Sequence, residues 1–206
     1  MFGLPVSTER EKPLHKSEFV SHFGIKGRDK AQFDAEVSKM AFVNHLSPDT
    51  IPAWPKDGWG FWVLRVELKT QEASAATIAL LASNIRQRLV IAFQRGDETQ
   101  FAVSWKRLLK TAWTKTSDAV LGLKGRDAEG AWLGMIAQIG GFEIDAALGR
   151  GELEASFERQ LAERDGREKT LAEIARLERM LRKEKQTRRI NELYAQIRRL
   201  KAAVGI

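Results

Sequence analysis

The chain has 206 residues and a net charge of +7, from 34 Lys/Arg against 27 Asp/Glu. It has no cysteine, which excludes disulfides and thiolate chemistry and fits a reducing compartment. No run of residues approaches the ~18 apolar residues of a membrane span, and the N-terminal sequence MFGLPVSTEREKPLHK lacks the apolar segment of a secretory signal. We therefore expect a cytoplasmic protein without membrane contact.

The positive charge is concentrated towards the C-terminus. Residues 150–206 carry 15 Lys/Arg and 10 Asp/Glu, a net charge of +5, whereas the net charge of residues 1–149 is only +2. All six tryptophans lie between Trp54 and Trp132, so the hydrophobic core is expected before residue 150. The sequence predicts an α/β core domain over 1–149, with an N-terminal arm, and a basic helical or coiled-coil extension over 150–206.

The first third of the chain predicts two helices followed by two strands. Residues 1–15 are expected to form an extended arm, because Pro5 and Pro13 restrict the backbone. The clearest strand is Phe61 to Lys69, FWVLRVELK, in which alternate residues point to opposite faces. The elements expected before it are helices at 18–23 and 28–38 and a strand at 39–45.

An Ala/Leu-rich helix is expected at 73–87, followed by two strands at 89–94 and 100–105 that form a hairpin around the turn RGDE. A further helix is expected at 128–139, ended by two glycines. Asp29 and Asp127 each follow a Gly-Arg turn and are predicted to be N-cap or first-turn residues. The fold class is therefore α/β, with α+β possible: a small mixed sheet of about four strands flanked by helices.

The C-terminal extension contains two apolar stripes. The first consists of Leu171, Ile174, Leu177 and Leu181, and the second of Ile190, Leu193, Ile197, Leu200 and Val204. The second stripe has the alternating spacing of three and four that is typical of a helix packed on another helix. Between the stripes lies the polar segment RKEKQTRR. If this segment continued one helix, the second stripe would lie on the opposite side of the helix from the first.

Two arrangements of this extension remain open at this point. In a helical hairpin the two stripes face each other, and the chain needs no partner. In one long helix the stripes require a partner, most simply a second copy of the chain. The extension then acts as an oligomerisation or adaptor device, in a homo-oligomer or another helix-mediated complex, and its charge only keeps it soluble.

The same region has a dense cationic surface. Between Arg176 and Lys201 there are ten Lys/Arg and three Asp/Glu. A basic patch on one element is typical of a protein that binds a polyanion, although a solvated helix face has the same composition. The expected contacts with DNA or RNA phosphates are Arg182, Lys183, Lys185, Arg188 and Arg189.

A metal-dependent nuclease is the alternative function. Glu67 and Lys69 form an E-x-K triplet, and Asp57 lies ten residues before the glutamate, a spacing similar to that of PD-(D/E)XK nucleases. In that family the carboxylates lie on neighbouring strands. Here residues 59–69 are predicted to form one strand, which would place Asp57 and Glu67 about 30 Å apart. A solvated sheet face is the simpler interpretation.

No metal site or cofactor is predicted. The three histidines, His15, His22 and His45, lack the H-x-x-x-H or H-E-x-x-H spacing of a helical metal site. Walker A, G-x-G-x-x-G and G-x-S-x-G motifs are absent from the sequence. The sequence therefore favours a binding protein over an enzyme.

The order of several segments resembles a known family. These segments are FGLPVSTEREKPLHK, LSPDTI, FWVLRVELK, LVIAFQ with QFAVSWKR, and LRKEKQTRRINELYAQIRRLK. Together they resemble the bacterial domain-of-unknown-function family 4391 over nearly the whole chain; Lys12, Pro13, Leu14, Lys16 and residues 183–186 match its pattern. Members are similar in context to accessory proteins of restriction or anti-phage loci. The resemblance therefore implies an accessory protein, with a larger helicase or methyltransferase subunit as partner, and assigns no catalytic residue.

Overall fold

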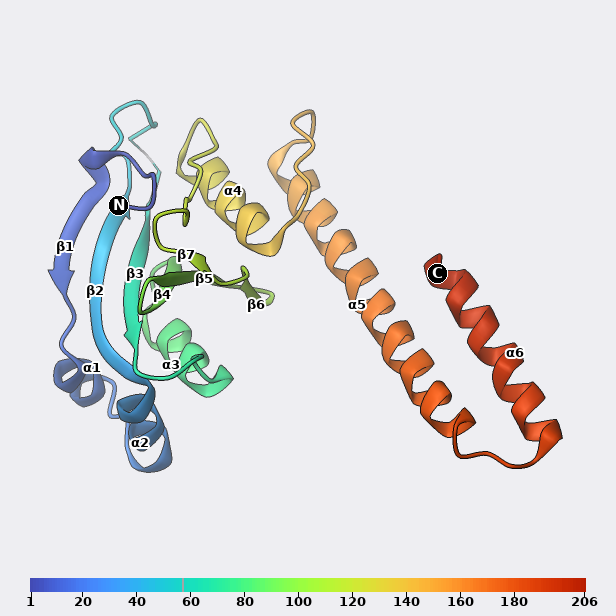
Figure 1. Ribbon diagram of the computed structural model, residues 1–206. Helices are drawn as coiled ribbons and strands as arrows, with labels where there is room; N and C mark the ends of the chain where they lie inside the picture. The colour runs from blue at the N-terminus through green and yellow to red at the C-terminus, as the bar shows by residue number, and fades with distance from the viewer. Residues whose placement is uncertain (57) are drawn as a thin grey trace. The chain divides into compact units, whose positions relative to one another are not determined.

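The computed structural model describes residues 1–56 and 58–206. Two compact units make up the chain, an N-terminal unit of Met1–Ala146 and a C-terminal unit of Ala147–Ile206. Figure 1 shows a sheet with helices in the first unit and helices alone in the second. Within the described residues, none of the helices combines the length and apolarity needed to cross a bilayer.

A seven-stranded mixed sheet forms the centre of the N-terminal unit. Its strands are β1 (Glu9–Pro13), β2 (Val37–Leu46), β3 (Phe61–Leu68), β4 (Leu89–Arg95), β5 (Glu98–Trp105), β6 (Arg107–Lys110) and β7 (Thr114–Lys115). They lie in the order β1 to β6, and β7 also pairs with β5. All pairs are antiparallel except β3 with β4, which are joined by helix α3 (Ala75–Asn84). The predicted α/β class is confirmed, but the sheet has more strands than the expected four.

The other elements of this unit are a short 3-10 helix, η1 (Val6–Thr8), and the helices α1 (Lys16–His22), α2 (Gly27–Glu36) and α4 (Ala128–Gly140). Asp127 caps α4 by accepting a hydrogen bond from the Gly130 amide at 2.7 Å. Asp29 lies in the first turn of α2. Both aspartates therefore have the structural roles predicted for them.

The N-terminal segment differs from the predicted arm. Residues 9–13 are extended, but they pair antiparallel with β2, with Lys12 opposite Phe42 and Pro13 opposite Ala41. Every residue of β1 is exposed, so the strand lacks the apolar alternation that signals a sheet. Short, charged edge strands that end in proline protect a sheet against pairing with another chain.

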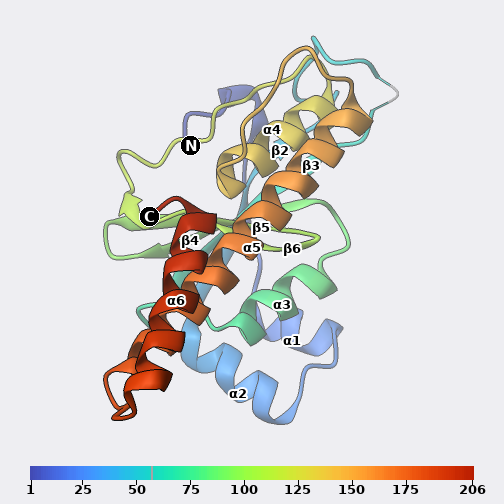
Figure 2. The same cartoon turned by 90° about the vertical axis from the view of Figure 1, so that its right-hand side faces the viewer.

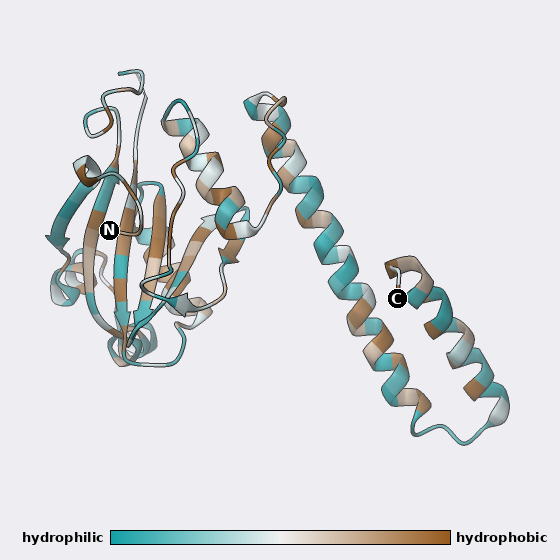
Figure 3. Ribbon diagram, turned by 45° about the horizontal axis from the view of Figure 1, so that its top comes forward, coloured by the Kyte–Doolittle hydropathy of each residue, from teal (hydrophilic) through white to brown (hydrophobic). Residues whose placement is uncertain are grey.

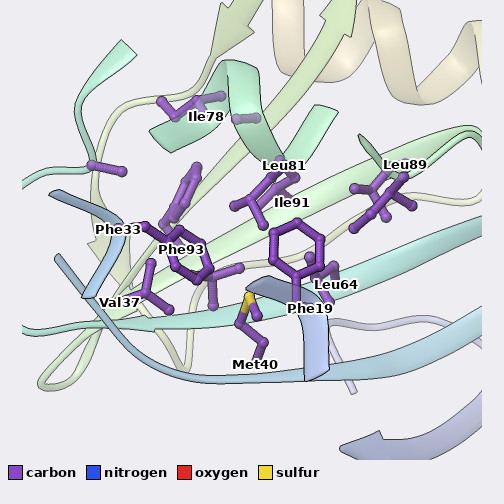
Figure 4. Packing of buried hydrophobic residues seen from close by; sticks show 14 of the residues in the cluster. Phe19, Phe33, Val37, Met40, Leu64, Ile78, Leu81, Leu89, Ile91 and Phe93 are labelled. Carbon is purple, nitrogen blue, oxygen red and sulfur yellow. The ribbon is translucent and has the colours of Figure 1, made fainter. Parts of the chain in front are cut away.

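Helices α1, α2 and α3 cover one face of the sheet. Figure 4 shows the core on this face, where Phe19 and Phe33 stack with ring centroids 5.5 Å apart above strand residues such as Leu64. On the opposite face the N-terminal segment closes the core: the Phe2 ring lies edge-on to Phe101 at 5.2 Å. Helix α4 also packs against β5 and β6, so apolar layers cover the sheet on both faces.

The C-terminal unit is a helical hairpin of α5 (Arg150–Leu181) and α6 (Thr187–Val204). The two helices lie side by side, as Figures 1 and 2 show. Their apolar stripes meet in a cluster whose buried members are Ile174, Leu177, Leu193 and Ile197. The structure therefore has the helical hairpin and not the single long helix. The two apolar stripes would lie on opposite sides of a straight helix, but they face each other because the chain reverses between α5 and α6.

Candidate functional site

The apolar seam of the hairpin, which is the second stripe of residues 190–204, packs against α5 of the same chain. Leu193 and Ile197 are buried, Leu200 and Val204 are partly buried against the same cluster, and Ile190 is partly buried outside it. Figure 3 shows hydrophobic bands on both helices and a hydrophilic connecting segment. The seam therefore stabilises the hairpin and presents its connecting segment at one end.

The five cations predicted to meet phosphate lie together at this end, in the tip of the hairpin (residues 182–189). The three that precede α6 are Arg182, Lys183 and Lys185, and none of their side chains has an ion-pair or hydrogen-bond partner among the described residues. Arg188 and Arg189, in the first turn of α6, share the carboxylate of Glu192 at 3.3 and 3.4 Å. The Arg188 side chain is still 94% exposed, so its guanidinium remains accessible to a ligand.

One acidic side chain, Glu184, lies within the tip, and it is turned towards the backbone. Its Oε1 accepts hydrogen bonds from the amides of Lys185 at 2.8 Å and Gln186 at 3.0 Å. The hydrogen bond from Gln186, with that from Lys185, holds the pKa of the Glu184 carboxyl below its ordinary value. Glu184 thus shapes the turn into α6 rather than pairing with the neighbouring cations, and the tip keeps a local charge of +4 from five cations and one anion.

Of the three residues of the nuclease alternative, the structure describes Glu67 and Lys69. Asp57 lies outside the described residues. Glu67 is on β3 as predicted, opposite Lys39 of β2 and Gln94 of β4. The Arg65 Nε lies 4.0 Å from Oε1 of Glu67. Arg65 also pairs with Glu11 at 2.7 Å, so the surroundings of Glu67 are a set of paired charges on a sheet face.

Lys69 and two other lysines hold the end of α2. The Lys69 Nζ donates to the Asp34 carbonyl oxygen at 2.8 Å. The Lys30 and Lys16 ammonium groups lie 2.6 and 3.3 Å from the Asp34 carboxylate. The hydrogen bond from Lys30 is the main reason that the pKa of Asp34 is lowered. A cavity of about 840 Å³ adjoins this cluster, but Lys16 and Lys30 are already paired with protein groups.

Two of the three histidines make aromatic ring contacts. The His45 ring stacks on Trp62 at 3.9 Å, and burial, helped by the charge of Arg10, lowers its pKa. His22 lies edge-on to Phe23, and His15 precedes α1. Among the described residues, no three His, Cys, Asp or Glu side chains come together in a group that could hold a metal ion.

An arginine that the sequence did not single out forms a second polar centre in the N-terminal unit. The Arg88 guanidinium lies 3.2 Å above the ring centroid of Trp59 and 5.5 Å from that of Trp132. Its Nη1 is 2.8 Å from Oε1 of Glu129 on α4. Because these residues come from three separate segments, of which α4 supplies Glu129 and Trp132, no local pattern in the sequence relates them.

The fold and the tip define an α/β protein that carries a basic helical hairpin. The chain belongs to the family described as Domain of unknown function (DUF4391), whose model matches residues 2–204. The family expected from the order of the sequence segments is thus confirmed. Neither a curated protein nor a solved structure matches the chain.

Proposed function

We propose that this protein is a non-enzymatic accessory protein of the cytoplasm that associates with nucleic acid through the tip of its helical hairpin. The observation that carries the proposal is the group of three unpaired cations, Arg182, Lys183 and Lys185, beside the exposed Arg188 and Arg189. Exposed cations that make no ion pair or hydrogen bond can replace the counterions that surround nucleic-acid phosphates. Contacts between these cations and phosphates carry no sequence information, so the binding is expected to be independent of sequence.

The hairpin supports this proposal as a scaffold. Its seam is satisfied between α5 and α6, and an ion pair of 2.8 Å between Lys201 and Glu178 also links the helices. The tip is therefore held by two helices that are packed on each other. We further propose that the protein serves a bacterial restriction or anti-phage system beside a helicase or methyltransferase, a role suggested by the context of family members, which is similar to that of accessory proteins in such loci.

The salt dependence of duplex binding tests the role of the tip. If all five cations meet B-DNA phosphates, log K should fall with log salt with a slope of about −4.5, because each contact contributes about −0.9. A triple tip variant, Arg182→Gln with Lys183→Gln and Lys185→Gln, should reduce the magnitude of the slope to about 1.8. Fluorescence anisotropy of a labelled duplex at several salt concentrations measures both values.

A control variant with the same change in net charge shows whether the position of the cations in the tip matters, or only their number. Arg150→Gln, Arg167→Gln and Lys169→Gln also remove three exposed cations from the C-terminal unit, but outside the tip. This variant should keep nearly the slope of the unmodified chain. If the tip variant and the control lose the same amount of affinity and slope, the tip is not the contact surface and the proposal is wrong.

A further inference from the structure

Trp59 differs from the other tryptophans in its exposure. Its side chain is 51% exposed, whereas the other five are buried or half-buried. One face of its ring stacks on the Arg88 guanidinium at 3.2 Å, so the exposure belongs to the other face and the edge. A large aromatic face left in water forgoes a substantial gain from burial, and such faces are common at binding sites.

The support beneath Trp59 is held in place. Arg88 is fixed by Glu129 at 2.8 Å, and both side chains are largely shielded, with 25% and 15% exposure. Trp132, on the same helix as Glu129, lies near the guanidinium as well. A planar cation clamped in this way holds the Trp59 ring in one orientation and leaves its outer face ready for a second planar group.

A cavity next to Arg88 supplies complementary polar groups. Its volume is about 230 Å³, and its lining includes Arg86, Arg88, Ser104 and Trp132. Arg86 is exposed, and its guanidinium has no ion-pair partner among the described residues. Arg88 therefore adjoins both the exposed Trp59 ring and a cavity whose lining includes an available cation. An aromatic face and a cation are the two features that proteins use to bind a base and its phosphate.

We propose that Trp59 is a stacking platform for a base of single-stranded nucleic acid, with Arg86 meeting a nearby phosphate. A single strand is the fitting ligand because its bases can leave their neighbours and stack on a protein ring, whereas those of an intact duplex are already stacked. The inference rests on the proposed function, since the tip supplies general attraction to the phosphate backbone. It adds the class of ligand: a strand with unpaired bases.

A strand without bases separates stacking from charge. Labelled single strands are titrated in two forms of equal length and charge, one with bases and one made entirely of abasic sites, as DNA and as RNA. The unmodified chain should bind the base-bearing strand about 5- to 160-fold more tightly than the abasic one, the range expected for one stacked base. Trp59→Ala should bind both strands equally, and Trp59→Phe should keep part of the preference.

Two further variants make the outcome unambiguous. Val6→Ala alters another exposed apolar side chain, 79% exposed, and should keep the full preference. The triple tip variant should weaken both strands equally and leave their ratio unchanged. A Trp59→Ala protein that remains folded by circular dichroism and keeps the preference overturns the stacking site alone. A tip variant that binds both strands as tightly as the unmodified chain overturns the proposed function, whatever the ratio is.

Discussion

The carboxylate of Glu36 accepts two hydrogen bonds from Ser74, one from the amide at 2.9 Å and one from the hydroxyl at 3.1 Å. Glu36 ends α2 and is only 8% exposed, while Ser74 is the N-cap of α3. Gln32 donates a third hydrogen bond to the same carboxylate at 2.9 Å. A single buried anion thus links two helices that cover the same face of the sheet.

Replacing Glu36 by alanine should destabilise the N-terminal unit by about 1–3 kcal/mol, because it leaves half-buried donors on Ser74 without their acceptor. All six tryptophans lie in this unit, so their fluorescence during urea unfolding reports on it. Glu18→Ala, at an exposed position on α1, is the control and should change the free energy of unfolding by less than about 0.5 kcal/mol. Equal effects of the two substitutions would contradict the role given to Glu36.

The same carboxylate should make stability depend on pH. Burial acts to raise the pKa of Glu36, but hydrogen bonds from Gln32, Thr77 and Ser74 outweigh it and hold the pKa below its ordinary value of 4.5. A lowered pKa in the folded state adds stability above the unfolded-state pKa, and this stability is lost as the pH falls through the folded-state pKa. The difference in unfolding free energy between the unmodified chain and Glu36→Gln should be constant near neutral pH and should shrink below about pH 4.5. A difference that grows on acidification would refute this assignment.

The hairpin depends on a small apolar cluster. Leu193→Ala should cost the C-terminal unit about 2–5 kcal/mol, as is typical when a buried leucine is truncated. Amide hydrogen exchange of α5 and α6 should accelerate, while exchange in the sheet stays unchanged. Tyr194→Ala, at the next position and with 59% exposure, is the matched control. Exchange that is unaffected by Leu193→Ala would show that the seam does not hold the hairpin together.

Two glycines should respond to alanine with opposite signs. A Cβ at Gly60, just before β3, would lie 2.3 Å from the Leu46 carbonyl oxygen, so Gly60→Ala should destabilise the N-terminal unit by about 1–3 kcal/mol. A Cβ at Gly166 in α5 would meet nothing within 4 Å, and Gly166→Ala should stabilise its helix by about 0.5–1 kcal/mol. Thermal unfolding followed by circular dichroism measures both signs. Stabilisation by Gly60→Ala would disprove the close approach to Leu46.

Strong local patterns allowed the central elements to be predicted. The alternation of FWVLRVELK indicated β3, and the RGDE turn between two apolar runs indicated the β4–β5 hairpin. The edge strands β1 and β6 were missed because they are short and mostly exposed or half-exposed, so they carry little alternation. Their pairing is determined by the neighbouring strands and not by their own composition.

The sequence by itself determined the α/β class, the basic extension and the residues of its apolar seam, because periodicity and charge are local properties of the chain. Only the tertiary structure decided that α5 and α6 fold back on each other, since the stripes on either side of residues 182–189 suit two arrangements that differ in long-range contacts. It alone also placed Trp59 on Arg88. Residues far apart in the chain come into contact through the packing of whole helices and strands, so no local spacing in the sequence predicts these contacts.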